Sequence, residues 1–313
     1  MARTVIARKF GDIEDLELVD LPVAEPLDGQ VSLRVMATSV NPADLKQLRG
    51  TFGGSTFPLR LGSEVSGVVA AVGPDAVGPA GPISVGDEVV GYPVRGGFAE
   101  QLIVKASSVL PKPASVGWGE AAGLLVGAVT AFHLVEAVAV ARGDRVIVHG
   151  ASGNVGLAAV QLARARGAEV IGTVSASHHD DMRALGAIPV LYGPGLEDRL
   201  RALLPDGADA ALDTVGTDEA LDASVALVAD RQRIATIAGF AQAAELGIRL
   251  LGSGPGADPG TELRNGARLE MLQRAADGLL VGPPVIAFPL EQVRQAMALV
   301  AGGHAGGKVI LLP

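Results

Sequence analysis

The sequence predicts an α/β protein with two parts, a β-rich barrel-like domain and a doubly wound parallel sheet. Two patterns carry this prediction. Short apolar runs separated by Gly and Pro turns fill residues 1 to about 115, which is typical of a barrel. From Arg145 onward, β-branched runs alternate with amphipathic runs, as in a parallel sheet with helices on both faces.

In the first part, strands are expected at residues 30–37 and 65–72, and a turn followed by a short strand at 86–91. The Ala-rich residues 119–140 are expected to be helical, with an interruption around Gly127. The stretch therefore predicts a change from strands to helices near Trp118.

The alternating part predicts parallel strands joined by helices. Strands are expected at 146–149, 169–174, 188–191, 209–212 and 232–237. Helices are expected at 154–166, 180–185, 196–204 and 218–227. The pieces that follow are irregular at 246–260, amphipathic at 269–280, extended at 283–288, helical at 290–301 and a strand at 308–312. Because these last pieces break the alternation, the predicted domains are residues 1–118 with 262–313, and residues 119–261.

Composition excludes several classes of function. The chain has 313 residues, a net charge of −9 and no cysteine. The negative charge argues against nucleic acid as a partner, and the lack of cysteine removes thiolate nucleophiles and Cys-ligated zinc. The five histidines form no HExxH pair, so no metal is expected. Without a signal-peptide pattern or an uninterrupted membrane-length apolar run, we expect a cytoplasmic protein with no membrane partner.

The most informative segment is the strand, glycine turn and helix of residues 146–166. Glycines at 150, 153 and 156 lie between the β-branched strand and the Ala-rich helix. Such a turn seats a dinucleotide pyrophosphate, because the backbone can approach the phosphates and the first helical amides point at the anion. The spacing is GxxGxxG rather than GxGxxG, so a turn without a ligand is the alternative; the strand at 169–174 completes the βαβ start and favours the cofactor.

The end of the second strand indicates which cofactor binds. An Asp or Glu there would bond the ribose 2′-hydroxyl of NAD, but Val174 is followed by Ser175-Ala176-Ser177-His178. Hydroxyls and an imidazole can donate to a 2′-phosphate, so the sequence favours NADPH. The alternative, compatible with phosphate binding, is a polar turn that caps a helix beginning at Asp180.

Six further motifs occur in order along the chain: Asn41-Pro42-Ala43-Asp44, the LGSEVSGVV of residues 61–69, the GFAE of 97–100, the pairs Ala121-Ala122 and Thr130-Ala131, the LDTVG of 212–216 and the GKVIL of 307–311. In these motifs the chain resembles the zinc-independent medium-chain dehydrogenases/reductases of the quinone oxidoreductase and enoyl reductase type. The resemblance implies a GroES-like domain with a Rossmann domain inserted before its last elements, and hydride transfer from NADPH to a quinone or an α,β-unsaturated carbonyl.

The resemblance also implies where the cofactor binds. Asn41 and Thr130 are expected near the nicotinamide. The remaining contacts are expected from the glycine turn, the 2′-phosphate site and three later segments, at Gly150, Ser152, Gly153, Asn154, Val155, Ser175, Ser177, His178, Tyr192, Val215, Ala238, Gly239 and Lys308. For Asn41 the alternative is turn capping, for Tyr192 a surface position, and for Lys308 a solvated strand position. Asp44 is expected to cap a short helix, and His133 and His149 to be structural.

Two departures from the relatives affect the chemistry. Phe52 stands where many relatives carry a Tyr implicated in proton donation, and His178 stands where a Lys is usual. Phe52 is expected to be an apolar wall on the substrate side, so the proton comes from water or another residue, and a neutral His178 would soften NADPH selectivity. The alternative function is a non-catalytic NADPH-binding sensor or assembly partner. A homodimer is an expectation from the family alone.

Overall fold

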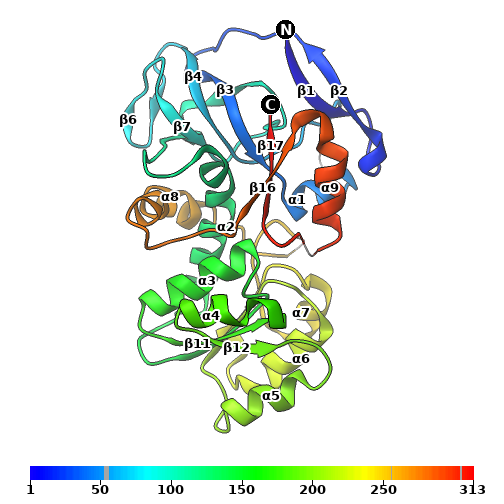
Figure 1. Cartoon of the computed structure of the whole chain (residues 1–313), viewed down its shortest axis with the longest axis vertical. Coiled ribbons are helices and arrows are strands. Elements are labelled where there is room, and N and C mark those ends of the chain that lie inside the picture. Colours follow the sequence, from blue (N-terminus) through cyan, green and yellow to red (C-terminus); the bar gives the residue numbers. More distant parts are fainter. Residues whose placement is uncertain (53–55, 255, 304) are drawn as a thin grey trace. The chain divides into compact units, whose positions relative to one another are not determined.

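The computed structural model describes residues 1–52, 56–254, 256–303 and 305–313, so Gly53, Gly54 and His304 lie outside the described residues. The chain forms two compact units (Figure 1). The first comprises residues 1–126, 272–278 and 284–313, and the second residues 127–271 and 279–283. The units divide inside helices α2 (Trp118–Ala137) and α8 (Thr261–Ala276), whereas the predicted boundaries, 118/119 and 261/262, fall at the beginnings of the same two helices.

The first unit is built on a seven-stranded sheet. Its order is β16-β17-β3-β4-β7-β9, and β8 also pairs with β3. The strands are β3 (Gln30–Ser39), β4 (Val65–Val72), β7 (Glu88–Gly91), β8 (Gln101–Lys105), β9 (Val109–Pro111), β16 (Val285–Pro289) and β17 (Lys308–Leu312). Two hairpins complete it, β1 (Ala2–Ala7) with β2 (Leu16–Leu21), and β5 (Val77–Gly78) with β6 (Gly81–Pro82).

The C-terminal strand returns to this unit, as the broken alternation predicted. β17 pairs antiparallel with the end of β3, with Ile310 opposite Ser39. Helices α1 (Pro42–Leu48) and α9 (Val293–Ala301) lie side by side next to it (Figure 1) and share one apolar core with Val309 and Leu311. This register brings Lys308 to the place where the chain leaves β3 and enters α1.

The second unit is an all-parallel six-stranded sheet of order β12-β11-β10-β13-β14-β15. Its strands are β10 (Arg145–His149), β11 (Glu169–Val174), β12 (Ile188–Leu191), β13 (Ala210–Asp213), β14 (Ile234–Thr236) and β15 (Arg249–Leu250). The helices that join them are α3 (Asn154–Ala165), α4 (His179–Ala184), α5 (Leu196–Leu203), α6 (Asp218–Leu227) and α7 (Phe240–Leu246). The strand order reverses at β10, and such a switch point is where ligands bind in open α/β sheets.

The doubly wound sheet of the second unit confirms the predicted fold class, and three helical details were wrong. α2 runs without interruption through Gly127, because that glycine serves packing: an added Cβ would lie 2.5 Å from Asn154 Nδ2. α7 occupies residues for which no helix was predicted. α8 begins at Thr261 and not at residue 269. α2 is long and apolar enough to span a membrane by length and composition, but 72% of its apolar window is buried inside the protein.

Candidate functional site

The glycine turn connects β10 to α3, and its three glycines have different tasks. Gly150 has a φ of 71°, and a Cβ on it would lie 2.5 Å from Val215 Cγ1. A Cβ on Gly156 would lie 2.1 Å from the Gly150 carbonyl oxygen, so this glycine lets the helix pack on the turn. Of the atoms that the structure describes, only the Gly150 carbonyl oxygen would lie within 4 Å of a Cβ on Gly153, at 3.4 Å. Gly153 is therefore the glycine that the fold itself does not require.

The backbone of the turn divides into amides used internally and amides at the helix start. Gly150 N donates to Thr173 Oγ1 at 3.3 Å, and Gly153 N donates to the Gly150 carbonyl at 3.0 Å. Leu157 N closes the first bond of the helix, to the Gly153 carbonyl at 2.8 Å. Helix geometry leaves the amides before this bond without intrahelical acceptors, and the positive end of the helix dipole lies there. The start of α3, including Val155, is thus suited to hold an anionic phosphate.

The ends of β13 and β14 reach the same edge of the sheet. Asp213 accepts the amides of Val215 at 3.1 Å and Gly216 at 3.0 Å, which fixes the turn after β13. Gly216 touches the turn after β14, because its Cβ would lie 2.3 Å from Gly239 N. The amides of Ala238 and Gly239 both donate to Thr236 Oγ1. Ala238 and Gly239 can therefore make van der Waals contact with a ligand, but their amides are already bonded to Thr236.

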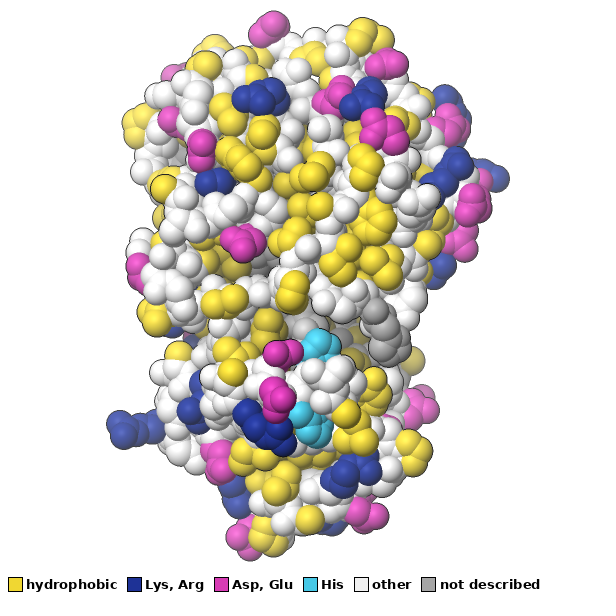
Figure 2. All heavy atoms as spheres, in the orientation of Figure 1, with side chains coloured by type: hydrophobic (Ala, Val, Ile, Leu, Met, Phe, Trp, Pro, Cys, Tyr) yellow, Lys and Arg dark blue, Asp and Glu magenta, His cyan; other side chains and the backbone are white. Residues whose placement is uncertain are grey.

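The residues predicted to bind a 2′-phosphate gather at the end of β11. Ser175 Oγ and Ser177 Oγ are 2.8 Å apart, and Tyr192 N donates to the carbonyl of Val174 at 3.4 Å, which brings the half-exposed Tyr192 beside them. Helix α4 begins at His179, not at Asp180, and has no side-chain cap, so the capping alternative was wrong. Histidine side chains are visible on this unit beside acidic and basic ones (Figure 2).

One carboxylate comes close to this cluster, which the strand-tip pattern did not reveal. His178 Nδ1 lies 2.9 Å from Asp181 Oδ2. A phosphate that uses His178 must therefore share it with a carboxylate. This arrangement weakens the cationic character of the site compared with a lysine.

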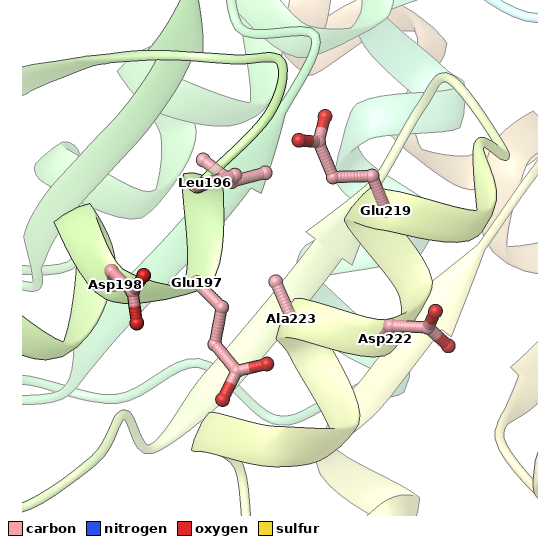
Figure 3. A pocket seen from close by; sticks show the side chains of 7 residues that line it. Leu196, Glu197, Asp198, Glu219, Asp222 and Ala223 are labelled. Carbon is pink, nitrogen blue, oxygen red and sulfur yellow. The ribbon is translucent and has the colours of Figure 1, made fainter.

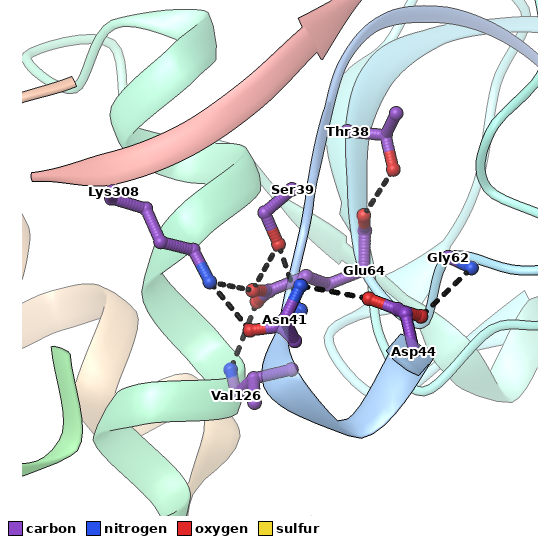
Figure 4. A network of polar contacts seen from close by, with 8 residues as sticks. All are labelled: Thr38, Ser39, Asn41, Asp44, Gly62, Glu64, Val126 and Lys308. Atoms are coloured by element: carbon purple, nitrogen blue, oxygen red, sulfur yellow. Dashed lines mark hydrogen bonds and ion pairs between the residues drawn. The ribbon is translucent and has the colours of Figure 1, made fainter. Parts of the chain in front are cut away.

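In the first unit, Lys308 and Asn41 meet in a buried polar network (Figure 4). Lys308 Nζ donates to Asn41 Oδ1 at 2.5 Å and lies 3.4 Å from Glu64 Oε1. Lys308 is only 6% exposed, so the alternative of a solvated strand lysine was wrong. Glu64 is fully buried and also accepts Ser39 Oγ at 2.6 Å and Val126 N at 2.9 Å.

This network fixes the side chain of Asn41. Its Nδ2 donates to Ser39 Oγ at 3.1 Å while its Oδ1 accepts from Lys308. The carboxamide retains one N–H for a ligand. Asn41 is also the N-cap residue of α1 and forms a capping box with Asp44, so the capping alternative holds beside the contacts with Ser39 and Lys308.

Asp44 holds the backbone of the same segment. Its carboxylate accepts Asn41 N at 2.8 Å and Gly62 N at 3.1 Å. Burial raises the pKa of Asp44 to about 6, and these two hydrogen bonds and Lys308 oppose that rise. Asp44 thus stabilises the start of α1 from the third helical position, in keeping with its predicted capping role.

Two other predicted residues are placed within their own units. Phe52 follows α1 in the first unit and is 37% exposed. Thr130 lies on the part of α2 that belongs to the second unit and is 7% exposed. His133, predicted to be structural, is buried and lies 3.3 Å from Asp258 Oδ2 and 3.2 Å from Arg264 Nε.

A separate hollow of about 340 Å³ lies between α5 and α6 (Figure 3). Its lining includes four carboxylates, from Glu197, Asp198, Glu219 and Asp222. Like charges repel, so this hollow does not suit an anionic nucleotide. Within residues 1–52, 56–254, 256–303 and 305–313, no group of three or more His, Cys, Asp or Glu side chains could hold a metal ion.

Comparison with known proteins finds similarity to dehydrogenase domains and to quinone oxidoreductases. Residues 27–114 match the alcohol dehydrogenase GroES-like domain, and residues 154–253 match the zinc-binding dehydrogenase domain. The spectinabilin polyketide synthase system protein NorB of Streptomyces orinoci is 32% identical over 96% of this chain, which spans only 14% of that relative. The quinone oxidoreductase of Homo sapiens is 29% identical over 100% of this chain and 98% of its own length.

Among solved structures, a mycobacterial protein in complex with NADPH is 29% identical and has a TM-score of 0.86. The match covers 100% of both chains. The sequence similarity and the shared fold therefore both extend over the two compact units.

Proposed function

Since the chain belongs to the zinc-independent medium-chain dehydrogenases/reductases of the quinone oxidoreductase and enoyl reductase type, we propose that it is an NADPH-dependent reductase. The hydride acceptor is a quinone or an α,β-unsaturated carbonyl compound. The observation that carries this proposal is the turn between β10 and α3, where Gly153 leaves room for a ligand in front of the first helical amides. The match to a mycobacterial protein in complex with NADPH supports it.

The second unit supplies the cofactor contacts in this proposal. The pyrophosphate takes the amides at the start of α3 with Ser152, and the 2′-phosphate takes Ser175, Ser177, His178 and Tyr192. Val215, Ala238 and Gly239 line the sheet edge beside it, and Thr130 faces the nicotinamide. When bound, NADPH supplies the hydride.

The first unit supplies Asn41, whose remaining N–H is available to a carbonyl oxygen of the substrate or the nicotinamide. Lys308 was predicted to contact the cofactor, but its ammonium is directed at Asn41 and Glu64. We therefore assign Lys308 the task of positioning Asn41. A donor held in advance in a buried site strengthens binding of charge that develops on an oxygen.

Phe52 has no proton to give, so we propose that solvent protonates the product. A reduced quinone needs no positioned acid for this step, and a quinone therefore needs less from the site than an enone. Phe52, which is 37% exposed, then acts as an apolar contact for the substrate.

The test is cofactor titration followed by turnover. NADPH and NADH are titrated by fluorescence, and NADPH oxidation is then followed over a panel of quinones and enones. Tighter binding of NADPH with turnover of at least one compound supports the proposal. Tight binding without turnover would favour the alternative, a non-catalytic NADPH-binding sensor or assembly partner, and equal affinity for NADH would remove the argument from residues 175–178.

A cytoplasmic location and a homodimer complete the proposed description. Gel filtration with light scattering tests the second of these, and cell fractionation the first.

A further inference from the structure

His149, the last residue of β10, lies beneath the glycine turn and is fully buried. Its Nε2 is 3.1 Å from Ser224 Oγ, and Ser224 Oγ donates to the Ala220 carbonyl at 2.7 Å. A serine hydroxyl has one proton, so Ser224 can only accept from the histidine. The proton of His149 is therefore on Nε2, and Nδ1 is an acceptor.

The other side of the ring orients Thr173. Nδ1 of His149 is 3.3 Å from Thr173 Oγ1, so the threonine hydroxyl donates to the ring. This leaves the lone pairs of Thr173 Oγ1 for the Gly150 amide, also at 3.3 Å. Burial lowers the pKa of His149, which keeps the ring in the neutral form that this chain of bonds requires.

The opposite side of the same peptide group is held as well. The carbonyl of His149 accepts Thr214 Oγ1 at 2.7 Å, while the amide of Gly150 donates to Thr173. The His149–Gly150 peptide is thus fixed by a hydroxyl on each side. Gly150 has a φ of 71° and its carbonyl accepts the Gly153 amide, so the orientation of this peptide decides the path of the whole turn.

We propose that Thr173, oriented by His149, is a positioning residue for the phosphate-binding turn. Its hydroxyl keeps the Gly150 amide directed into the protein, so that the amides at the start of α3 face the pyrophosphate. This inference rests on the proposed cofactor-binding function. It assigns to a buried threonine on β11 an effect on the pyrophosphate subsite, although Thr173 is only 2% exposed.

The test compares three variants. Thr173→Val removes the hydroxyl and keeps the shape, and Thr173→Ser restores the hydroxyl. Ser66→Ala is the control, since it removes a buried hydroxyl that donates to the Trp118 carbonyl in the first unit, outside this chain of bonds. ADP is the probe for the pyrophosphate, NADPH is the second ligand, and thermal unfolding of each variant measures stability separately.

We expect Thr173→Val to weaken binding of ADP and NADPH about fivefold to tenfold, which corresponds to the loss of one hydrogen bond. Thr173→Ser and Ser66→Ala should bind both ligands like the wild type. Wild-type affinity in Thr173→Val, or an equal loss in Ser66→Ala, would overturn the inference. If Thr173→Val does not fold, Thr173→Ala takes its place in the same comparison.

The two proposals fail in different ways. A wild-type protein that binds neither ADP nor NADPH refutes the proposed function and, with it, this inference. A wild-type protein that binds both, combined with a Thr173→Val variant that also binds both, refutes only the role of Thr173.

Discussion

Replacing Lys308 with Met should destabilise the first unit strongly, because it leaves a buried carboxylate without its counter-ion. Lys308 Nζ lies 3.4 Å from Glu64 Oε1, and Glu64 is fully buried. Met fills a similar volume but has no charge and no donor. The substitution also removes the 2.5 Å hydrogen bond to Asn41 Oδ1.

The size of the effect follows from the partners that remain. Removing one member of a buried ion pair costs about 3–5 kcal/mol. Glu64 keeps Ser39 Oγ at 2.6 Å and Val126 N at 2.9 Å as donors, so we expect the lower end, about 3 kcal/mol. Adding Glu64→Gln removes the unpaired charge, and the double variant should recover part of this loss, with a coupling of about 0.5–3 kcal/mol.

The chain has a single tryptophan, so its fluorescence reports on the unfolding of one part of the protein. Trp118 belongs to the first unit, where its carbonyl accepts Ser66 Oγ at 2.7 Å and Lys112 Nζ lies 4.6 Å from the centre of its ring. Urea unfolding followed by Trp118 fluorescence therefore reports on the unit that contains Lys308. A loss below about 1 kcal/mol for Lys308→Met, or a double variant no more stable than the single one, would refute the view that the pair is electrostatically coupled.

Three further predictions concern other parts of the molecule. Gly156→Ala should destabilise the second unit by about 1–3 kcal/mol or more, because its Cβ would lie 2.1 Å from a backbone oxygen. Gly153→Val, in contrast, should fold and lose NADPH binding. Thermal unfolding measures the first effect, and cofactor titration measures the second. The pKa of Asp44 is raised to about 6, so the folded state binds an extra proton between the ordinary pKa of an aspartate and pH 6, and the free energy of unfolding should fall as pH rises through this range. In urea unfolding at several pH values, Asp44→Asn should remove this pH dependence. A pH dependence that persists in the variant would belong to another group. Phe52→Tyr should change turnover of a quinone little and raise turnover of an enone, toward the range of about 10²–10⁴-fold that a positioned acid contributes; equal loss of activity on both substrates would indicate packing instead.

The sequence predicted five of the six parallel strands, because these five are short, apolar and bounded by turns. It missed β15, whose two residues lie in the stretch 246–260 that was expected to be irregular. β11, β12 and β17 were predicted to the residue. α7 was missed, because its sequence, FAQAAEL, has no strong apolar stripe and follows Gly239, which comes shortly after β14. The helix break at Gly127 was wrong, since periodicity cannot show that a neighbouring side chain needs the space of a Cβ.

The site was predictable only where it is formed by residues that are neighbours in the sequence. The glycine turn and residues 175–178 are such local patterns, and in the structure each forms a compact cluster. The contact between Lys308 and Asn41 spans 267 positions of the chain and depends on the register of β17 against β3. Thr173 and His149 give no signal of their own, because a buried threonine and histidine in two strands have the composition of an ordinary core.

The placement of β16 and β17 also determines the order in which the protein can be completed during synthesis. The strands of the second unit lie between residues 145 and 250, so that unit's whole sheet leaves the ribosome before Lys308 is made. Until then, Glu64 has no lysine beside it, and the end of β3 has no β17 to pair with. The buried charge that anchors Asn41 is thus neutralised only after the sheet of the second unit has been made, and a nascent chain is expected to bind ADP before it can hold Asn41 in place.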